Sequence, residues 1–327
     1  MKTYNIKAIY RMAWIIALVA VTGFSIAACD GGGDTGGHTH SWADTVNSRL
    51  CTTCGELNFT PDVTIDLESG EVSGATNTAT APDITINPAA GASVLITGDS
   101  GATLRNIRID AVADIYFHSS ARLKGRGTTA FRVQVGSTMY GGGPDVSISG
   151  SESTNNNNAI TIDASGGSST DTTTLAGSFG IISGGNRLTH AGGRGIAVNR
   201  GSLLITASIT AIRGGNSGYD QANSTWSRNG GDAIYMGNSG SSLTISGTID
   251  LIKGGDGGSA ATGSNRDGAD GGRGIYDASP SGNVTVTIDG ASNGTAPSWI
   301  QGGAPGLGHG TGANGEPGVP INATGWN

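Results

Sequence analysis

Two histidines and two cysteines near the N-terminus have the residue types and spacing to bind a metal ion. His38 and His40 precede a Cys51-Thr-Thr-Cys54-Gly turn, and all four lie in the short segment 38–57. A Cys-x-x-Cys turn presents two thiolates to one tetrahedral ion, and zinc accepts mixed Cys and His ligation. In an oxidising compartment the same cysteines would form a disulfide instead. The spacing therefore predicts a small His/Cys module that holds a structural zinc ion, a Cys51–Cys54 disulfide or neither.

A cluster of basic residues in the middle of the chain has the chemistry to bind an anion. Six of the 18 lysines and arginines fall within the 28 residues from 105 to 132. Cations at strand spacing would pair with repeated carboxylates or sulfates, so the segment predicts a contact surface for an acidic glycan or another polyanion. The alternative is a solvated face balanced by Asp110 and Asp114. The six candidates are Arg105, Arg108, Arg122, Lys124, Arg126 and Arg132.

The composition indicates what kind of fold positions these groups. The chain has 327 residues, of which 58 are Gly, 13% are charged and 5% are aromatic. Soluble domains average about 7% Gly and about 25% charged residues. A helix-rich fold is disfavoured because Gly costs roughly 1 kcal/mol per helical position relative to Ala. Collagen is excluded because Gly does not recur at every third position. Short alternating apolar runs instead predict a repetitive β-structure.

From residue 58 onward, apolar and polar residues alternate in short runs typical of half-buried strands. The pair Ile84 and Ile86 is followed by similar pairs 23 residues later and 24 residues after that, a coil length that fits about three strands of a parallel β-helix. We expect Thr64, Thr85, Arg108 and Arg132 to share one outward face. The apolar pairs are Val63/Ile65, Ile84/Ile86, Val94/Ile96, Ile107/Ile109, Ile115/Phe117, Phe131/Val133, Val146/Ile148 and Ile160/Ile162.

The C-terminal half carries an open sequence repeat. The apolar residues of segment 203–212 recur 40 residues later in 243–252. The series continues with Val284 and Val286 at a displacement of 41, and with Ile300 at a displacement of 48. Each unit is therefore predicted to be one coil that carries one long Gly-rich loop.

The Gly-rich loops 214–231, 254–272 and 302–318 should emerge on the same side of the coils. Between Gly303 and Gly318 several glycines are three residues apart, which is the period of a polyproline II helix. These loops would be either polyproline-like strands packed beside the coils or flexible segments with few apolar anchors.

The coil length and turn chemistry resemble the right-handed parallel β-helix of the pectin-lyase-like superfamily and of many bacterial adhesins. The resemblance covers residues 58–327 and rests on the repeat period, not on a specific motif. It implies an all-β protein built as a single right-handed parallel β-helix, a solenoid with Gly-rich lateral loops.

Polysaccharide lyases and glycoside hydrolases of this class use clustered carboxylates as general acids and bases. The acids of this chain are scattered, and no Asp-Asp pair or Asp-x-Asp triplet occurs among the candidate strands. Gly308-His309-Gly310 is similar to a polygalacturonase tripeptide, but the motifs that accompany it are absent. We therefore predict no catalytic residue, and keep a lyase or hydrolase as the alternative.

The N-terminus indicates where the protein is located. Residues 1–28 combine three cations with an apolar run from residue 12, which is typical of a secretory signal peptide. Ile26-Ala-Ala-Cys29 resembles the lipobox of bacterial lipoproteins, which implies that Cys29 is diacylated and becomes the first mature residue, with 29–37 as a flexible tether. The alternative is a membrane span that retains residues 12–28.

Removal of residues 1–28 would delete three cations and no acid, which shifts the net charge from −7 to −10 and disfavours binding to nucleic acid. We expect a lipid-anchored protein of the bacterial cell envelope that serves surface display, adhesion or glycan binding, with the membrane and an acidic glycan or cell-surface ligand as partners. The outer membrane or cell surface is expected, and Asp30 leaves the inner membrane as an alternative.

Overall fold

The computed structural model describes residues 59–74, 83–101, 103–152, 157–163, 171–187, 190–218, 228–238, 240–262, 264–279, 282–289, 296–323 and 325–326. The chain divides into the units Met1–His40 and Ser41–Asn327, and all described residues belong to the second. The predicted signal peptide, the tether and the His/Cys module lie outside the described residues, and so do their candidate residues Cys29, His38, His40, Cys51 and Cys54.

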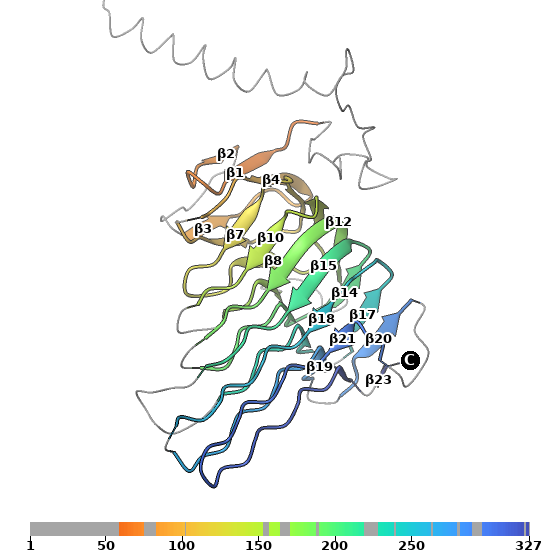
Figure 1. The fold of residues 1–327 in the computed structure, drawn as a ribbon. Coiled ribbons are helices and arrows are strands. Elements are labelled where there is room, and N and C mark those ends of the chain that lie inside the picture. The colour runs from red at the N-terminus through yellow and green to blue at the C-terminus, as the bar shows by residue number, and fades with distance from the viewer. Residues whose placement is uncertain are drawn as a thin grey trace, which may run out of the picture. The chain divides into compact units, whose positions relative to one another are not determined.

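The described part of the chain is all-β and contains no helix, as the composition predicted. Its strands form two sheets, which we call the large sheet and the small sheet. Apart from the antiparallel pair of β1 and β2, the paired strands of both sheets are parallel in these residues. Figure 1 shows the strands stacked one behind another along the chain.

The large sheet has two branches that share the long strand β12 (Thr172–Ser183). In spatial order, the first branch contains β2 (Val72–Ser73), β1 (Val63–Asp66), β4 (Ala92–Thr97), β6 (Ala113–Phe117), β9 (Thr138–Gly142), β12, β14 (Ser202–Ile205), β17 (Ser242–Ile245), β20 (Thr285–Ile288) and β23 (Gly325–Trp326). The second branch contains β7 (Arg122–Lys124), β10 (Ser147–Ser149), β12, β15 (Ser208–Arg213), β18 (Ile252–Lys253) and β21 (Ile300–Gln301).

The small sheet alternates with the large sheet along the chain. In most coils a small-sheet strand is followed by a first-branch strand and then a second-branch strand, as in β13, β14 and β15, which gives the three strands per coil that the spacing predicted. The exceptions are β4, which is followed directly by β5, and β12, which serves both branches. This arrangement is consistent with a β-solenoid. The small-sheet strands are β3 (Asp83–Ile86), β5 (Asn106–Ile109), β8 (Phe131–Gln134), β11 (Ile160–Asp163), β13 (Ile196–Val198), β16 (Ile234–Met236), β19 (Ile275–Asp277) and β22 (Ile321–Asn322).

The register confirms most of the sequence repeat. Leu203 pairs with Leu243, a displacement of 40, and Ile252 pairs with Ile300, a displacement of 48. The displacement of 41 for the next unit is wrong, because Leu243 pairs with Val286, 43 residues later. Val284, Val286 and Ile288 are all buried, so a shift of two residues preserves the alternation of the strand and leaves no trace in the pattern.

The apolar pairs fill the space between the sheets. Ile107, Ile109, Phe131 and Val133 are at most 1% exposed. The residues between them point outward, and Arg108 pairs with Arg132 on adjacent small-sheet strands as expected.

Thr85 joins this outward row by pairing with Arg108. Thr64 does not, because it lies on β1 and pairs with Leu95 in the large sheet. The prediction that Thr64 shares the face of Arg108 is therefore wrong. The alternation identified the inward positions but not the sheet to which each strand belongs.

Glycine-rich runs connect the second branch of the large sheet to the small sheet. We call the runs that leave β12, β15, β18 and β21 outgoing runs, and the runs that lead into β13, β16, β19 and β22 returning runs. They lie side by side on one side of the stacked strands (Figure 1), as the repeat predicted.

Hydrogen bonds link the two kinds of run alternately. Gly215 donates to Gly193 at 2.7 Å, Gly231 to Gly215 at 2.9 Å, Gly255 to Gly231 at 2.8 Å and Gly272 to Gly255 at 2.7 Å. The same pattern continues through Gly303 to Gly318, with donor–acceptor distances of 2.8 and 3.0 Å. Outgoing runs also bond to one another, and so do returning runs.

These glycines have no room for a side chain. A Cβ built on Gly215 would overlap the carbonyl of Gly185, and one built on Gly303 would overlap the carbonyl of Gly255. The described runs are therefore two layers in backbone-to-backbone contact. Of the two alternatives for these loops, the structure supports packed strands.

Candidate functional site

The six candidate cations do not form one surface. Arg108 and Arg132 lie on the small sheet, whereas Arg122 and Lys124 lie on β7 in the second branch of the large sheet. Strands that are neighbours in sequence belong to different sheets or to different branches of the large sheet, so closeness in sequence did not place these side chains together.

Arg108 and Arg132 each pair with a carboxylate. Arg108 Nε lies 2.6 Å from Asp110 Oδ1, and an Arg132 terminal nitrogen lies 2.6 Å from Asp163 Oδ2. The alternative interpretation, a face whose charges are balanced by Asp110 and Asp114, is correct for Asp110. Asp114 lies elsewhere, on β6 in the large sheet. These two arginines are therefore neutralised by close partners.

Arg105 is buried, with 4% of its surface exposed. Its Nε donates to the carbonyl of Leu67 at 2.6 Å and a terminal nitrogen donates to the carbonyl of Glu68 at 3.0 Å. Gly70, at a φ of 78°, leaves room for the guanidinium, since a Cβ there would overlap it. Arg105 therefore ties a turn to the next coil and does not contribute to an outward surface.

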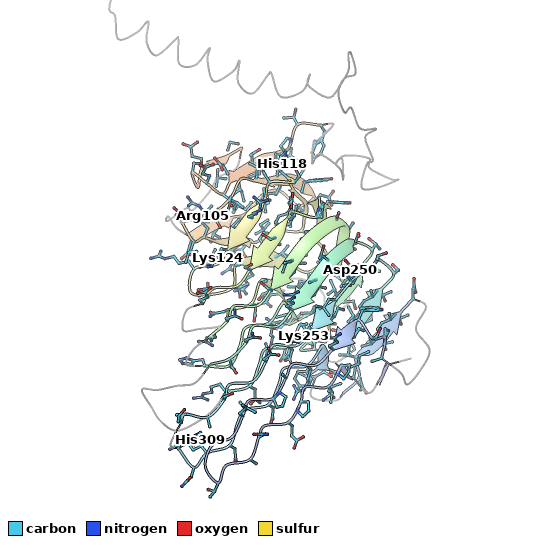
Figure 2. All side chains as sticks on the ribbon, viewed as in Figure 1. Arg105, His118, Lys124, Asp250, Lys253 and His309 are labelled. Carbon is cyan, nitrogen blue, oxygen red and sulfur yellow. The ribbon has the colours of Figure 1, made fainter. Side chains whose placement is uncertain are left out.

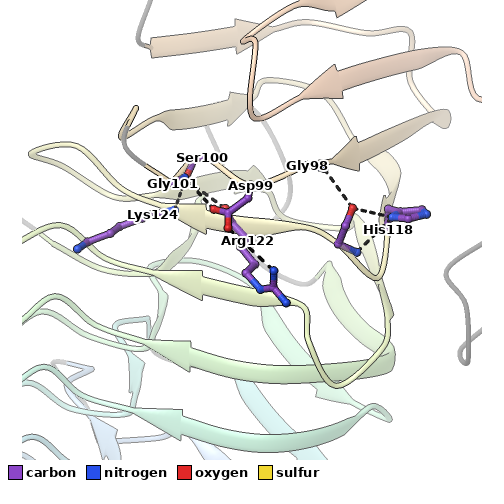
Figure 3. A network of polar contacts seen from close by, with 8 residues as sticks. Gly98, Asp99, Ser100, Gly101, His118, Arg122 and Lys124 are labelled. Atoms are coloured by element: carbon purple, nitrogen blue, oxygen red, sulfur yellow. Dashed lines mark hydrogen bonds and ion pairs between the residues drawn. The ribbon is translucent and has the colours of Figure 1, made fainter.

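The cations of β7 remain exposed. Arg122 lies 4.0 Å from Asp99, and Lys124 lies 3.4 Å from Glu152. Figure 3 shows that Ser100 bonds to the backbone on both sides of Leu123, accepting the Lys124 N–H at 2.8 Å and donating to the Arg122 carbonyl at 3.1 Å. The backbone of β7 is thus fixed while its two cationic side chains project outward. Arg126 is also exposed, and its side chain has no ion pair within the described ranges.

Lys124 begins a row of outward residues at equivalent positions of successive second-branch strands. Figure 2 labels its members Lys124 and Lys253. We call this set the Lys124 row, and its members in spatial order are Lys124, Ser149, Ser183, Arg213, Lys253 and Gln301.

Arg213 and Lys253 were not among the cations predicted from the sequence. The signal that identifies them was present, because they are separated by the same 40 residues as Ile212 and Ile252, and the structure pairs them on adjacent strands. Their register places both cations in one row with Lys124.

A groove of about 680 Å³ lies between the Lys124 row and the outgoing runs. Its lining comprises Ser147, Ser149, Ile181, Ser183, Gly184, Asn186, Arg213, Gly214, Asn216, Leu251, Lys253, Gly254 and Asp256. Ligand sites in proteins usually measure about 300–1,000 Å³. The groove is therefore large enough to hold part of a ligand.

Known proteins offer no close counterpart of the chain at the level of family, sequence or structure. No family model, curated protein or solved structure matches it.

A second polar cluster lies where the returning runs enter the small sheet. Arg194 and Arg273 stack on the rings of Tyr235 and Tyr276, with guanidinium carbons 3.3 and 3.6 Å from the ring centroids. Asp232 lies between the arginines, at 4.0 Å from Arg194 and 3.8 Å from Arg273. Burial raises the pKa of Asp232 above its ordinary value, although the Arg273 backbone N–H and both guanidinium charges oppose the shift. Asp232 offsets part of the charge of the two arginines, and the cluster joins the returning runs to the sheet.

His309 lies in the outer part of the glycine-rich hairpins (Figure 2), where its backbone pairs with Arg266.

Among the residues described, no group of three or more His, Cys, Asp or Glu side chains is placed to hold a metal ion. In the same residues, no helix is long and apolar enough to cross a membrane.

Proposed function

We propose that this chain is a lipid-anchored protein of the bacterial cell envelope that displays a β-solenoid and binds an acidic glycan with it, without a catalytic step. The lipobox-like Ile26-Ala-Ala-Cys29 supports the anchor. The observation that carries the binding function is the Lys124 row, in which three cations and two hydroxyl groups repeat at equivalent positions of parallel strands.

We also propose that residues 58–327 form a single right-handed parallel β-helix. The regular alternation of small-sheet, first-branch and second-branch strands supports one continuous path. Right-handedness follows from the general rule that about 98% of crossovers between parallel strands have this hand. Such a helix offers a long lateral surface with a fixed spacing between equivalent side chains.

A test of the function uses the full chain in detergent with polymers of known charge. Saturable binding of a polyuronate or a sulfated glycan, weakened by salt and without new reducing ends or unsaturated products, is the expected result. Turnover of the polymer would replace this proposal with a polysaccharide lyase or glycoside hydrolase. Lack of retention on both polymers at low salt would refute the binding function.

We propose that segment 38–57 is a separate small module, stabilised by structural zinc or by a disulfide. Metal analysis combined with the intact mass before and after thiol alkylation distinguishes the two. Bound zinc with two free thiols would indicate the metal, and loss of two mass units without metal would indicate the disulfide. Two free thiols without metal would refute both.

A further inference from the structure

We propose that the groove between the Lys124 row and the outgoing runs binds one extended chain of an acidic glycan along the stack, with successive carboxylates at Arg213 and Lys253. This inference rests on the proposed function and assigns it a site and a ligand geometry.

One wall of the groove supplies cations and hydroxyl groups. Ser149, Ser183, Arg213 and Lys253 occupy consecutive positions of the Lys124 row, and all four line the groove. Arg213 is exposed and has no ion pair within the described ranges. Its guanidinium is therefore available to form a bidentate contact with a ligand carboxylate.

The outgoing runs supply amide donors to the lining. The side-chain oxygen of Asn186 accepts the backbone N–H of Asn216 at 2.8 Å, and that of Asn216 accepts the backbone N–H of Asp256 at 2.8 Å. Since these bonds occupy the oxygens, the NH₂ groups are the free ends, and neither has a protein acceptor in the described part of the chain. The lining thus has donors from both the Lys124 row and the outgoing runs, which suits carboxylate and sugar hydroxyl oxygens.

An apolar strip accompanies these donors. Ile181 is 40% exposed, and Leu251 is half-buried in the same lining. Sugar rings present a C–H face as well as hydroxyl groups, and the strip provides contact area for that face. A polymer made only of charged groups would not use it.

The spacing of the row fits a linear polymer. Parallel neighbours lie about 4.8 Å apart, so the five steps from Lys124 to Gln301 span about 24 Å. One sugar residue of an extended chain has roughly the length of one such step. Arg213 and Lys253, which lie one step apart, would therefore contact the carboxylates of neighbouring sugars.

The charge of the groove favours a polymer with a low charge per unit length. Lys253 lies 3.2 Å from Asp256, which also lines the groove, so the two cations are partly offset. The whole chain carries a net charge of −7. This charge repels any polyanion outside the groove, and a DNA duplex, with one charge per about 1.7 Å, would meet more of that repulsion than a uronate chain with one carboxylate per sugar.

The test titrates a galacturonate hexamer into the full chain in detergent and compares it with the methyl-esterified hexamer, which has the same shape without charge. The variant R213S/K253S removes both cations of the groove. The matched control R126S/R200S removes two exposed cations that do not line the groove. Circular dichroism and thermal melting verify that each variant remains folded.

We expect the hexamer to bind R213S/K253S at least tenfold more weakly than the parent, the control to stay within twofold, and the ester to bind the parent weakly. In the parent, the hexamer should also protect Lys253 from acylation, and this measurement can still be made if the double variant fails to fold.

Equal binding by R213S/K253S and no protection of Lys253 would overturn the groove as the binding site but leave the proposed function. Failure of the parent to bind either the hexamer or a sulfated glycan would overturn the function itself. Tighter binding of single-stranded DNA than of the hexamer would overturn the ligand class.

Discussion

Replacing Gly255 with Ala tests whether the glycine runs pack backbone against backbone. Gly255 is buried in the outgoing run that follows β18. It donates its N–H to Gly231 at 2.8 Å and accepts the N–H of Gly272 at 2.7 Å. A Cβ on Gly255 would overlap the carbonyl of Gly215, a backbone group that has no rotamer into which it could move.

The expected effect has opposite signs for packed and unpacked runs. In an unpacked run, Gly→Ala at an ordinary φ stabilises a protein by about 0.4–1 kcal/mol, because it restricts the unfolded chain. In the packed layers, the overlap costs about 1–3 kcal/mol. The layers must also separate and weaken two hydrogen bonds, each worth about 1 kcal/mol. The free energy of local opening should therefore fall by roughly 3–5 kcal/mol.

Hydrogen exchange is the suitable assay, because stacked coils can open locally without unfolding the whole array. In G255A, the amides of Gly272 and Gly303 should exchange at least a hundredfold faster than in the parent. The control G240A changes a glycine with a φ of 79°, where an added Cβ would meet no atom within 4 Å beyond its chain neighbours, and costs about 1 kcal/mol from its backbone conformation alone. Its effect should stay near residue 240. Unchanged or slower exchange at Gly272 in G255A would refute the packing.

Three further changes test other parts of the account. Ile109→Asp should lower the free energy of unfolding by roughly 3–5 kcal/mol, because it buries an unpaired charge at a position with 0% exposure. The control Thr85→Asp, on the outward face, should change the free energy of unfolding little. Equal denaturation midpoints for the two variants would contradict the assignment of Ile109 to the core. Because burial raises the pKa of Asp232 above 3.8, the protonated form stabilises the fold below that pH and the contribution is lost as pH rises through the raised pKa. The stability difference between the parent and Asp232→Asn should therefore shift against the parent as pH rises through this range in urea melts, and a difference independent of pH would count against the burial argument. Cys29→Ala should lose acylation and leave the detergent phase, whereas a mutant that stays in that phase would indicate that residues 12–28 are retained as a span.

Many of the strands could be predicted because they bury alternate side chains. Ile107 and Ile109 point inward, as their spacing indicated, and Arg108 lies outside opposite Arg132. Alternation cannot distinguish two strand registers that differ by two residues. The predicted register of the strand that contains Val286 was wrong by that amount. Nor does alternation identify the sheet of each strand, which is why Thr64 was placed on the wrong face.

The candidate site was harder to predict because its parts come from different coils. The cluster from Arg105 to Arg132 was visible in sequence, but burial removes Arg105 and ion pairs neutralise Arg108 and Arg132. Arg213 and Lys253 are isolated cations in sequence, and only the register of the second branch brings them together. The glycine runs gave no side-chain pattern from which their partners could be read.

The packed glycine layers restrict how relatives of such a protein could diverge. The facing glycines can hardly be replaced by any other residue, because a Cβ at most of them would overlap the backbone of a neighbouring run. Insertion is easier, since one added turn of three residues in each arm of a hairpin would keep every glycine facing the other layer. Evolution along this part of the chain should therefore change the lengths of the hairpins in steps of three residues per arm, and alter their sequence only at the side chains that point away from the layers.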